Sequence, residues 1–433
     1  MPEPAGARIK ATDSAAGPAI DAAAFAELAA ARRPGWSLDQ RFYVDEGILR
    51  LEMDRIFRRG WLLAGHSCQI AEPGDYLTCE VSGESILVVR GADSIARAYF
   101  NVCRHRGARL CRESSGRMRQ IVCPYHRWVY GLDGELLHTT WMGEDFDPSR
   151  FGLHPAHVEE LDGLLFVSTS DEPWDFEPVR SELSPVLRPH DLANTQVAHV
   201  YTYEVTANWK LVVENQRECY HCRSCHPEYV RVHYDADIDD PEMQPEIAAR
   251  LEEAKKRWES AGVDVSSVNT SSQYTGLWFR ANRTPFRPGC VTESLGGQPV
   301  APLLGRFTEA DMGTARVGSY LNFWLHATSD HAASIRYTPV GPTRTRLTAT
   351  WLVRRGAAEG ADYELDRLTA FTKVQLDQDR DLLDRQGLGV LSSRYRSGPY
   401  SPVKESNVER FVSWYLDVMS RPPGAGNGRD DLP

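Results

Sequence analysis

The sequence predicts an α+β fold in which a small antiparallel β domain precedes a larger domain of mixed helices and strands. Between about residues 61 and 170, β-rich runs such as YLTCEV, SILVVR and GLLFVS alternate with turns rich in Gly and Asp. Beyond residue 171, helical patterns alternate with the strand-like runs VAHVYTYEV, SYLNFWLH and RTRLTATWLV. The predicted domains are therefore 61–170 and 171–421.

The remaining segments are expected to be tails and helices. Segment 1–40 is predicted to be a tail and a short helix opened by Asp21, and segment 41–60 a helix of the larger domain. Residues 422–433 are predicted to be a disordered tail. The helices are expected at about 22–33, 45–59, 207–222, 245–262 and 363–385, the last being a long C-terminal helix.

Composition limits the class of protein and its partners. The 433 residues carry 49 basic and 60 acidic side chains, a net charge of −11, which argues against nucleic acid or an anionic membrane as a partner. We find no apolar run long enough to cross a bilayer and no signal peptide, so a cytoplasmic location is expected. The nine cysteines are odd in number, which favours metal ligation over a disulfide framework.

A first group of metal-binding residues lies in the predicted β domain. Cys103 and His105 form a Cys-x-His pair, and Cys123 and His126 form a Cys-x-x-His pair, each after a predicted strand. Two thiolates and two imidazoles are the ligands of a Rieske [2Fe–2S] cluster. The alternative is a Cys₂His₂ zinc site. Zinc sites usually pair Cys with Cys and His with His, so the mixed pairs favour the Rieske cluster.

A second group lies in the larger domain. His221 and His226 occupy a predicted helix, but a spacing of five residues turns the second side chain by about 140° from the first. Both can face one metal only if the helix unwinds, and Pro227 favours this by disfavouring a helical His226. Two histidines and one carboxylate bound on one face leave open positions, as in non-haem ferrous oxygenases.

The carboxylate is expected from the long C-terminal helix. Asp377, Asp381 and Asp384 share one face of this helix, whereas Asp379 lies on the apolar face. A carboxylate on an apolar face must be neutralised or bind a cation, so Asp379 is the candidate ligand. The alternative is that Asp379 pairs with an arginine such as Arg354.

Other residues near this group leave further alternatives open. Cys219, Cys222 and Cys225 form a CxxCxxC run that by itself suggests a second iron–sulfur or zinc site. The spacing drifts around a helix and no fourth cysteine matches it. His233 is a spare possible ligand, and a surface or core position is the simpler reading.

With these motifs, CRH…CPYH and NWK…EN…ExxHxxxxHP, the chain resembles the large (alpha) subunits of Rieske non-haem iron oxygenases. The segment ENQRECYHC is most similar to the branch that demethylates quaternary ammonium compounds such as glycine betaine and stachydrine. The resemblance implies a Rieske domain inserted in a helix-grip (START-like) catalytic domain, assembled as a head-to-tail homotrimer. It also implies a [2Fe–2S] cluster, a mononuclear Fe²⁺ ion bound by Asp379 and the histidines, and Glu218 as the bridge between the two centres. The alternative for Glu218 is an ion pair with Arg217 or Lys210.

The resemblance implies N-demethylation of a betaine-like compound with O₂, releasing formaldehyde. Electrons would come from NAD(P)H through a separate flavin and iron–sulfur reductase. A quaternary ammonium group binds against aromatic faces, and the aromatic runs supply Tyr274, Trp278, Phe279, Phe323 and Trp324. The rival functions are hydroxylation of an aromatic ring or terpenoid by the same centres, and electron transfer by a Rieske cluster alone.

Overall fold

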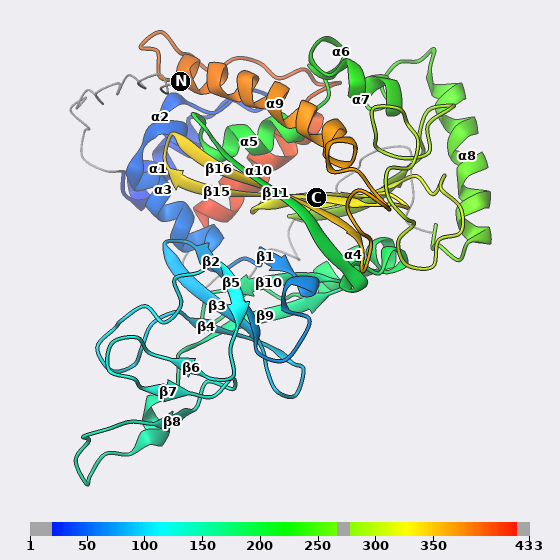
Figure 1. The fold of residues 1–433 in the computed structure, drawn as a ribbon. Coiled ribbons are helices and arrows are strands. Elements are labelled where there is room, and N and C mark those ends of the chain that lie inside the picture. Colours follow the sequence, from blue (N-terminus) through cyan, green and yellow to red (C-terminus); the bar gives the residue numbers. More distant parts are fainter. Residues whose placement is uncertain (1–19, 266–277, 422–433) are drawn as a thin grey trace, which may run out of the picture.

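The computed structural model describes residues 20–265 and 278–421, which form the predicted α+β fold. Three antiparallel sheets of seven, six and three strands are present in this part of the chain. Figure 1 shows the seven- and three-stranded sheets below, and the six-stranded sheet with most of the helices above. The tail expected at 422–433, the first 19 residues and Tyr274 lie outside the described residues.

The N-terminal β-rich part is built on the seven-stranded sheet, with the order β1-β10-β9-β4-β3-β2-β5. Because β1 pairs with β10, the two ends of this part of the chain lie side by side. The strands are β1 (Leu62–His66), β2 (Asp75–Val81), β3 (Glu84–Arg90), β4 (Ala96–Phe100), β5 (Ser115–Arg117), β9 (Pro155–Leu161) and β10 (Leu164–Ser168). The three-stranded sheet projects from it and comprises β6 (Ile121–Val122), β7 (Val129–Tyr130) and β8 (Leu136–His138).

The larger part is built on the six-stranded sheet, whose order is β11-β16-β15-β14-β13-β12. Its strands are β11 (Thr195–Val205), β12 (Phe279–Thr284), β13 (Thr314–Ser319), β14 (Phe323–Ala327), β15 (Ala332–Gly341) and β16 (Arg344–Arg354). The long helix α9 (Leu365–Val390) packs against β11 and against α5, and is the orange helix crossing above the sheet in Figure 1. An antiparallel sheet with a long C-terminal helix on one face is the expected helix-grip arrangement.

The remaining helices are mostly short. They are α1 (Ala22–Ala30), α2 (Gln40–Val44), α3 (Glu46–Glu52), α4 (Glu177–Leu187), α5 (Trp209–Gln216), α6 (Cys222–Cys225), α7 (Pro227–Val232), α8 (Gln244–Ser260) and α10 (Ser406–Ser420). The helix expected at 45–59 is α3, capped by Asp45 and continued by a π-helical turn, Met53–Phe57. Helix α10 was not predicted, although its buried apolar residues recur at helical spacing. In the described part of the chain, no helix has both the length and the apolar character needed to span a bilayer.

The continuous helix predicted at 207–222 is wrong, because α5 ends at Gln216. The chain then turns towards the six-stranded sheet, where buried Arg217 donates a hydrogen bond to the backbone oxygen of Ser319 at 2.7 Å. Two short helices, α6 and α7, follow, and Pro227 occupies the first position of α7. This break replaces a rigid helical spacing between the two histidines by a turn that allows them to converge.

A buried polar cluster fixes the start of α5 beneath the break. Asn208 caps the helix, and Lys210 forms a fully buried ion pair with Glu52 at 2.5 Å. The second oxygen of Glu52 accepts a hydrogen bond from the Trp209 indole, and Tyr415 of α10 donates to the first. Because each charged group is partnered, burial of the pair is tolerated and α5 has one fixed position on the core.

Candidate metal centres

Two similar loops of the β-rich part carry the first group of residues. Cys103 begins the turn after β4 and Cys123 the turn after β6. In each turn the cysteine carbonyl accepts a hydrogen bond from the residue four positions later, Gly107 at 3.0 Å and Arg127 at 3.2 Å. Both of these residues have positive φ, 74° and 60°, which tightens the turns. The loops therefore present their Cys and His side chains in a matching way.

The four side chains of these loops, Cys103, His105, Cys123 and His126, approach one another. The histidine rings are 4.6 Å apart between centroids, and both cysteines are buried free thiols. Among the residues that the structure describes, only the second group of candidate ligands has three ligand atoms within 4.8 Å of one another. No three ligand atoms of the first group are therefore that close. A single tetrahedral zinc ion needs ligand atoms closer than this. The spread favours the two irons of a [2Fe–2S] cluster over zinc.

The surroundings of these residues fit a Rieske cluster. Nδ1 of His105 is buried without a hydrogen-bond partner among the described residues, and its ring stacks on Trp128 at 4.7 Å and 8°. Burial raises the pKa of the Cys103 thiol, and the adjacent Cys123 raises it further, while the Tyr130 hydroxyl at 3.2 Å lowers it. Two neighbouring thiolates and an orphaned imidazole nitrogen are satisfied together by metal cations.

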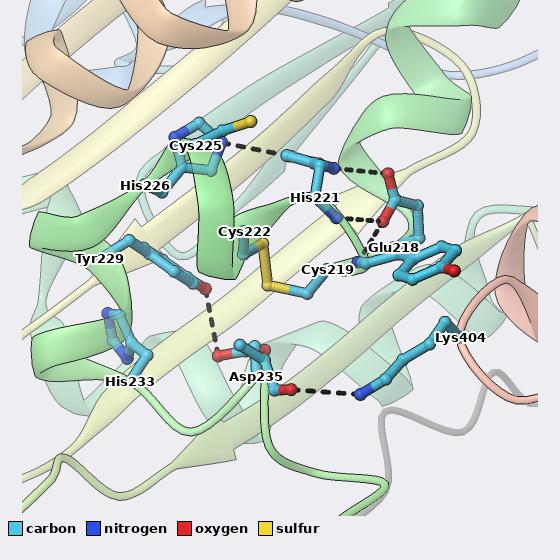
Figure 2. Close-up of a disulfide and its surroundings, with 12 residues drawn as sticks. Glu218, Cys219, His221, Cys222, Cys225, His226, Tyr229, His233, Asp235 and Lys404 are labelled. Atoms are coloured by element: carbon cyan, nitrogen blue, oxygen red, sulfur yellow. Dashed lines mark hydrogen bonds and ion pairs between the residues drawn. A yellow bond between two sulfur atoms is a disulfide. The ribbon is translucent and has the colours of Figure 1, made fainter.

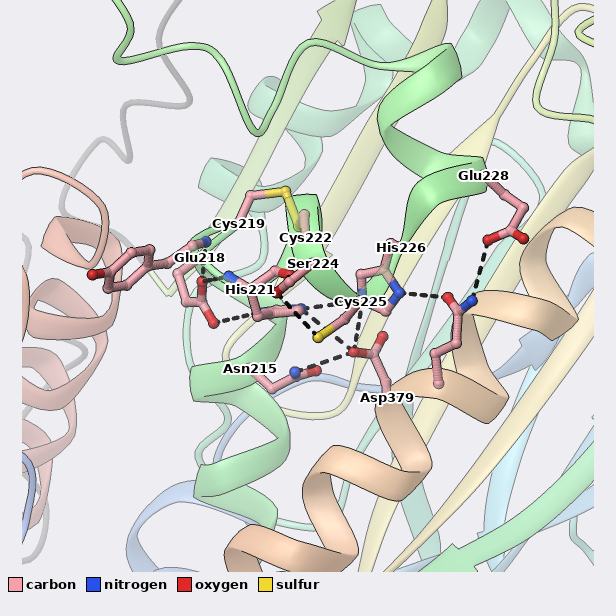
Figure 3. A network of polar contacts seen from close by, with 12 residues as sticks. Asn215, Glu218, Cys219, His221, Cys222, Ser224, Cys225, His226, Glu228 and Asp379 are labelled. Carbon is pink, nitrogen blue, oxygen red and sulfur yellow. Dashed lines mark hydrogen bonds and ion pairs between the residues drawn. A yellow bond between two sulfur atoms is a disulfide. The ribbon is translucent and has the colours of Figure 1, made fainter.

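The second group converges at the junction of α5, α6, α7 and α9. Nε2 of His221 lies 3.1 Å from Nε2 of His226, and Oδ1 of Asp379 lies 3.5 and 3.0 Å from these two atoms. Ligands about 2.1 Å from one ion in neighbouring octahedral positions are about 3 Å apart. Figure 3 shows the three side chains pointing to one place. The donor set and its spacing fit a ferrous ion bound on one face.

Second hydrogen bonds fix the orientation of each residue in this triad. Nδ1 of His221 donates to Oε1 of Glu218 at 2.5 Å, and Nδ1 of His226 donates to Oε1 of Gln378 at 2.7 Å. Asn215 donates to Oδ1 of Asp379 at 3.2 Å. Because both Nδ1 atoms donate, both Nε2 atoms keep a lone pair for a metal.

The pKa shifts of the triad indicate that protons occupy this site when no metal cation is bound. Burial lowers the pKa of His221, but hydrogen bonds with Asp379 and Glu218 outweigh it and raise the pKa to about 10. Burial raises the pKa of Asp379, and the contacts with both histidines reverse this and lower it. Without a metal, the site therefore holds protons between nitrogen and oxygen, and a bound cation takes their place.

The contacts of Asp379 and Glu218 bear on the alternatives given for these residues. Asp379 contacts the two histidines, and the expected alternative partner Arg354 is exposed at the end of β16. Glu218 contacts His221, whereas Lys210 is paired with Glu52. Glu218 lies in the loop after α5, so its contact with His221 comes from the turn and not from the predicted helical face.

Two of the three cysteines of the CxxCxxC run form a disulfide, and Cys225 is a free thiol. Cys219 and Cys222 are bonded with their Cα atoms 4.9 Å apart, within the normal range. Figure 2 shows this disulfide beside His221, with Cys225 turned away from it. The cysteine count argued against a disulfide framework, and this single local bond between residues three apart was not predicted.

A cavity of about 420 Å³ adjoins the triad. The triad and neighbouring residues form one wall, and strand residues of the six-stranded sheet form the opposite wall. Of the predicted aromatic residues, Trp324 lines the cavity. Phe323 faces the other side of β14 and packs on Phe166 at 5.4 Å, because neighbouring strand residues point to opposite faces. Trp278 and Phe279 are likewise buried in the core, against each other at 5.0 Å.

Two aromatic residues of the cavity were missed by sequence reasoning. Tyr203 of β11 and Tyr229 of α7 both line it, and the hydroxyl of Tyr203 is buried without a described partner. The sequence predicted a strand around Tyr203 and placed Tyr229 just after the second histidine. Neither pattern indicated that the two residues would line one cavity. His233 is fully buried beside Arg316 and Glu293, away from the triad.

Comparison with known proteins identifies the family. Residues 60–147 match the Rieske [2Fe-2S] domain model, and residues 192–421 match the model of the ring hydroxylating alpha subunit, catalytic domain. The glycine betaine monooxygenase oxygenase subunit of Chromohalobacter salexigens is 40% identical over 92% of this chain and 88% of the relative. The chain belongs to the Rieske oxygenase alpha subunits. The two matched regions of this Rieske oxygenase contain the two groups of candidate metal ligands described above.

Further relatives and a solved structure are similar to this Rieske oxygenase. The glycine betaine monooxygenase oxygenase subunit of Pseudomonas aeruginosa PAO1 is 36% identical over 92% of each chain. The carnitine monooxygenase oxygenase subunit of Escherichia coli K12 is 37% identical, over 44% of this chain and 52% of the relative. The quaternary ammonium Rieske monooxygenase CntA in complex with L-carnitine shares the fold, with a TM-score of 0.67 at 22% identity, covering 91% and 98% of the chains.

Proposed function

We propose that this Rieske oxygenase hydroxylates an N-methyl group of a betaine-like quaternary ammonium compound and so removes it as formaldehyde. The observation that carries the proposal is the convergence of His221, His226 and Asp379 in the wall of a cavity of about 420 Å³. The similarity to glycine betaine monooxygenase oxygenase subunits over most of both chains indicates the substrate class.

In the proposed reaction, the oxygen chemistry would be supplied by the metals that these residues would hold. When bound, a mononuclear iron supplies open positions for dioxygen, and a Rieske cluster supplies single electrons. One O₂, two electrons and two protons convert the N-methyl group into N-hydroxymethyl and one water. The N–CH₂OH product then breaks its C–N bond, giving formaldehyde, the amine and a proton.

The role of the chain is to hold and orient the reacting groups. Glu218 and Gln378 hold the two histidine rings with their Nε2 atoms towards the cavity. The indole of Trp324 and the ring of Tyr229 present aromatic faces in the same cavity, which suits a cation that has no N–H to donate. Such a cavity excludes bulk water while leaving room for a small substrate.

We also propose that the electron donor to the triad is the cluster of a neighbouring subunit in a homotrimer. In Figure 1 the loops around β6–β8 lie at the opposite end of the molecule from α6 and α7. Glu218 is hydrogen-bonded to His221 and lines the cavity, and a histidine of a neighbouring Rieske domain is expected to dock beside it. One solved structure of CntA is described as giving insight into inter-subunit electron transfer. A separate NAD(P)H-dependent flavin and iron–sulfur reductase is the proposed electron source.

The test uses the holoenzyme with a reconstituted reductase, NADH and oxygen. Glycine betaine, stachydrine and carnitine are compared with benzene and naphthalene, and formaldehyde, oxygen uptake and diol products are measured. We expect about one formaldehyde for each oxygen consumed with a betaine. Diol formation from an arene without formaldehyde from any betaine would reject the proposal in favour of ring hydroxylation.

The trimer and the role of Glu218 need separate measurements. We expect mass photometry to give three times the chain mass of 48.7 kDa. Glu218→Gln is expected to keep both iron centres and lose most formaldehyde production, with slow transfer of electrons from the reduced cluster. Normal turnover by this variant, or a monomer that is fully active, would contradict the proposed bridge.

A further inference from the structure

Three neighbouring strands of the six-stranded sheet bring cationic side chains to one end of the cavity floor, where the carboxylates of Asp235 and Glu293 also line the cavity. Arg316 of β13 and His326 of β14 are cross-strand partners, and Arg280 lies on the adjacent strand β12. All three line the cavity, as does Trp324, two residues before His326 on the same face of β14. An aromatic face and a cationic end therefore lie next to each other along one strand.

His326 is held by the buried carboxylate of Glu293, which also lines the cavity. Its Nδ1 lies 3.0 and 3.2 Å from the two carboxylate oxygens of Glu293, which is 3% exposed. A carboxylate only accepts hydrogen bonds, so Nδ1 of His326 carries a proton. The ring is thereby fixed through Nδ1, and His326 lines the cavity.

The charge on Glu293 is not balanced by its other neighbour, His233. Nε2 of His233 lies 3.1 Å from Glu293, but its Nδ1 accepts a hydrogen bond from Arg316 at 2.9 Å. A ring that accepts at one nitrogen is neutral. Arg316 in turn forms a two-point ion pair with Asp235, at 2.5 and 2.9 Å. Of these neighbours, His326 is therefore the group left to carry the charge that balances buried Glu293.

We infer that His326 donates a hydrogen bond from Nε2, as an imidazolium, to the carboxylate of a zwitterionic substrate. The inference rests on the proposed N-demethylation and narrows its substrate to compounds that carry an anion beside the quaternary ammonium. Among the described residues, the hydrogen bonds of His326 are those from Nδ1 to Glu293, and its side chain is 20% exposed. The ammonium then lies over Trp324, and the carboxylate lies at the cationic end of the floor.

Discrimination against analogues that lack a carboxylate follows from this arrangement. Choline has the same trimethylammonium group as glycine betaine but ends in a hydroxyl. A hydroxyl next to an imidazolium in a confined cavity makes a weaker hydrogen bond than a carboxylate does. The aromatic contact is the same for both compounds, so the difference between them isolates the group that binds the anion.

The test compares His326→Gln with the wild type on these two compounds. Glutamine keeps a donor of similar reach but cannot carry a positive charge. We expect kcat/KM for glycine betaine to fall about 10- to 100-fold, through KM, and that for choline to change less than about threefold. Where choline is not demethylated, its inhibition constant against glycine betaine gives the same comparison.

The chain offers a matched control on the same hairpin. His331 also pairs with a buried aspartate, Asp330, at 3.0 Å, but lies outside the residues that line the cavity. His331→Gln is expected to leave the betaine-to-choline ratio unchanged. Glu293→Gln is a second test, because it removes the charge that holds His326 protonated and should lower the ratio in the same direction.

The outcomes separate this inference from the proposed function. Equal losses for both compounds in His326→Gln, or no loss for glycine betaine, would overturn the role of His326 while formaldehyde release stands. A wild-type enzyme that binds glycine betaine by calorimetry, with the loss confined to His326→Gln, but releases no formaldehyde would support the anion site and reject demethylation. A His331→Gln variant with the same altered ratio would also overturn the inference, because the effect would then not be local.

Discussion

Gln378 accepts a hydrogen bond from Nδ1 of His226 at 2.7 Å, while the next residue of α9, Asp379, lies 3.0 Å from Nε2 of the same ring. The Gln378 amide also donates to Glu228 of α7 at 3.1 Å, which fixes its own orientation (Figure 3). One helix therefore supplies the carboxylate of the triad and also the group that sets the tautomer of a histidine in it.

Gln378→Met should weaken metal binding at the triad without removing a ligand. Methionine fills a similar volume but does not hold the His226 ring or its proton, and loss of such a supporting bond costs about 10- to 100-fold in metal affinity. The measurement is a titration of the metal-free site with Fe²⁺ under anaerobic conditions. Asp381→Asn, which removes an exposed ion pair with Arg385 on the same helix, is the control. Equal affinities in both variants would contradict the role of Gln378.

Asp379→Ala should remove the mononuclear iron and spare the cluster. The two loops that carry the cysteines belong to a different part of the fold, so their geometry is independent of α9. Total iron is expected to fall by about one third with acid-labile sulfide unchanged, as one of three irons is lost. Formaldehyde production should stop while the cluster still accepts electrons. Loss of sulfide together with iron would mean that the variant misfolds or that the assignment is wrong.

Tyr130→Phe should lower the reduction potential of the Rieske cluster. The buried hydroxyl of Tyr130 lies 3.2 Å from Sγ of Cys103, and hydrogen bonds to cluster sulfurs favour the reduced, more negative state. Removing one is expected to cost about 1–2 kcal/mol of this preference, or roughly 40–90 mV for one electron. A spectroscopic redox titration measures the shift. Tyr99→Phe, whose hydroxyl bonds to the Leu132 backbone, should leave the potential unchanged.

Glu214 should make the folded state less stable as pH rises towards neutrality. Burial raises the pKa of Glu214 to about 7, although hydrogen bonds from Tyr43 and Tyr400 and the charge of Lys210 lower it. The folded state therefore binds this proton more tightly than the unfolded state, whose pKa is about 4.3. Its stabilising contribution is complete below about pH 4 and is lost as pH rises to about 7.

Glu214→Gln isolates this contribution, because glutamine has nearly the same shape and does not titrate. Its amide oxygen accepts one of the two tyrosine hydrogen bonds, and its amide NH2 can donate to the oxygen of the other hydroxyl. The stability difference between wild type and variant, from denaturant unfolding, should shift by roughly 2–3 kcal/mol between pH 4.5 and pH 7.5, against the wild type. Parallel pH profiles would show that the carboxyl is not perturbed.

Local sequence patterns determined much of this protein. The alternation of strands and turns predicted the β-rich part, and the mixed Cys/His pairs selected the residues of the first group, because these ligands are close in sequence. The helical face of Asp379 selected one carboxylate out of the four between residues 377 and 384, since a single helix fixes which side chains share a face. The family resemblance was carried by the same motifs.

Tertiary structure alone decided how distant segments meet. The end of α5 at Gln216 and the Cys219–Cys222 disulfide depend on contacts with the sheet and on the turn. Which aromatic residues line the cavity depends on strand register, which placed Trp324 inside and Phe323 outside. The pairing of His326 with Glu293 joins residues 33 positions apart. A motif identifies residues that lie close together in the sequence. Burial and strand register depend on how distant segments pack against one another, and a local sequence pattern does not contain that information.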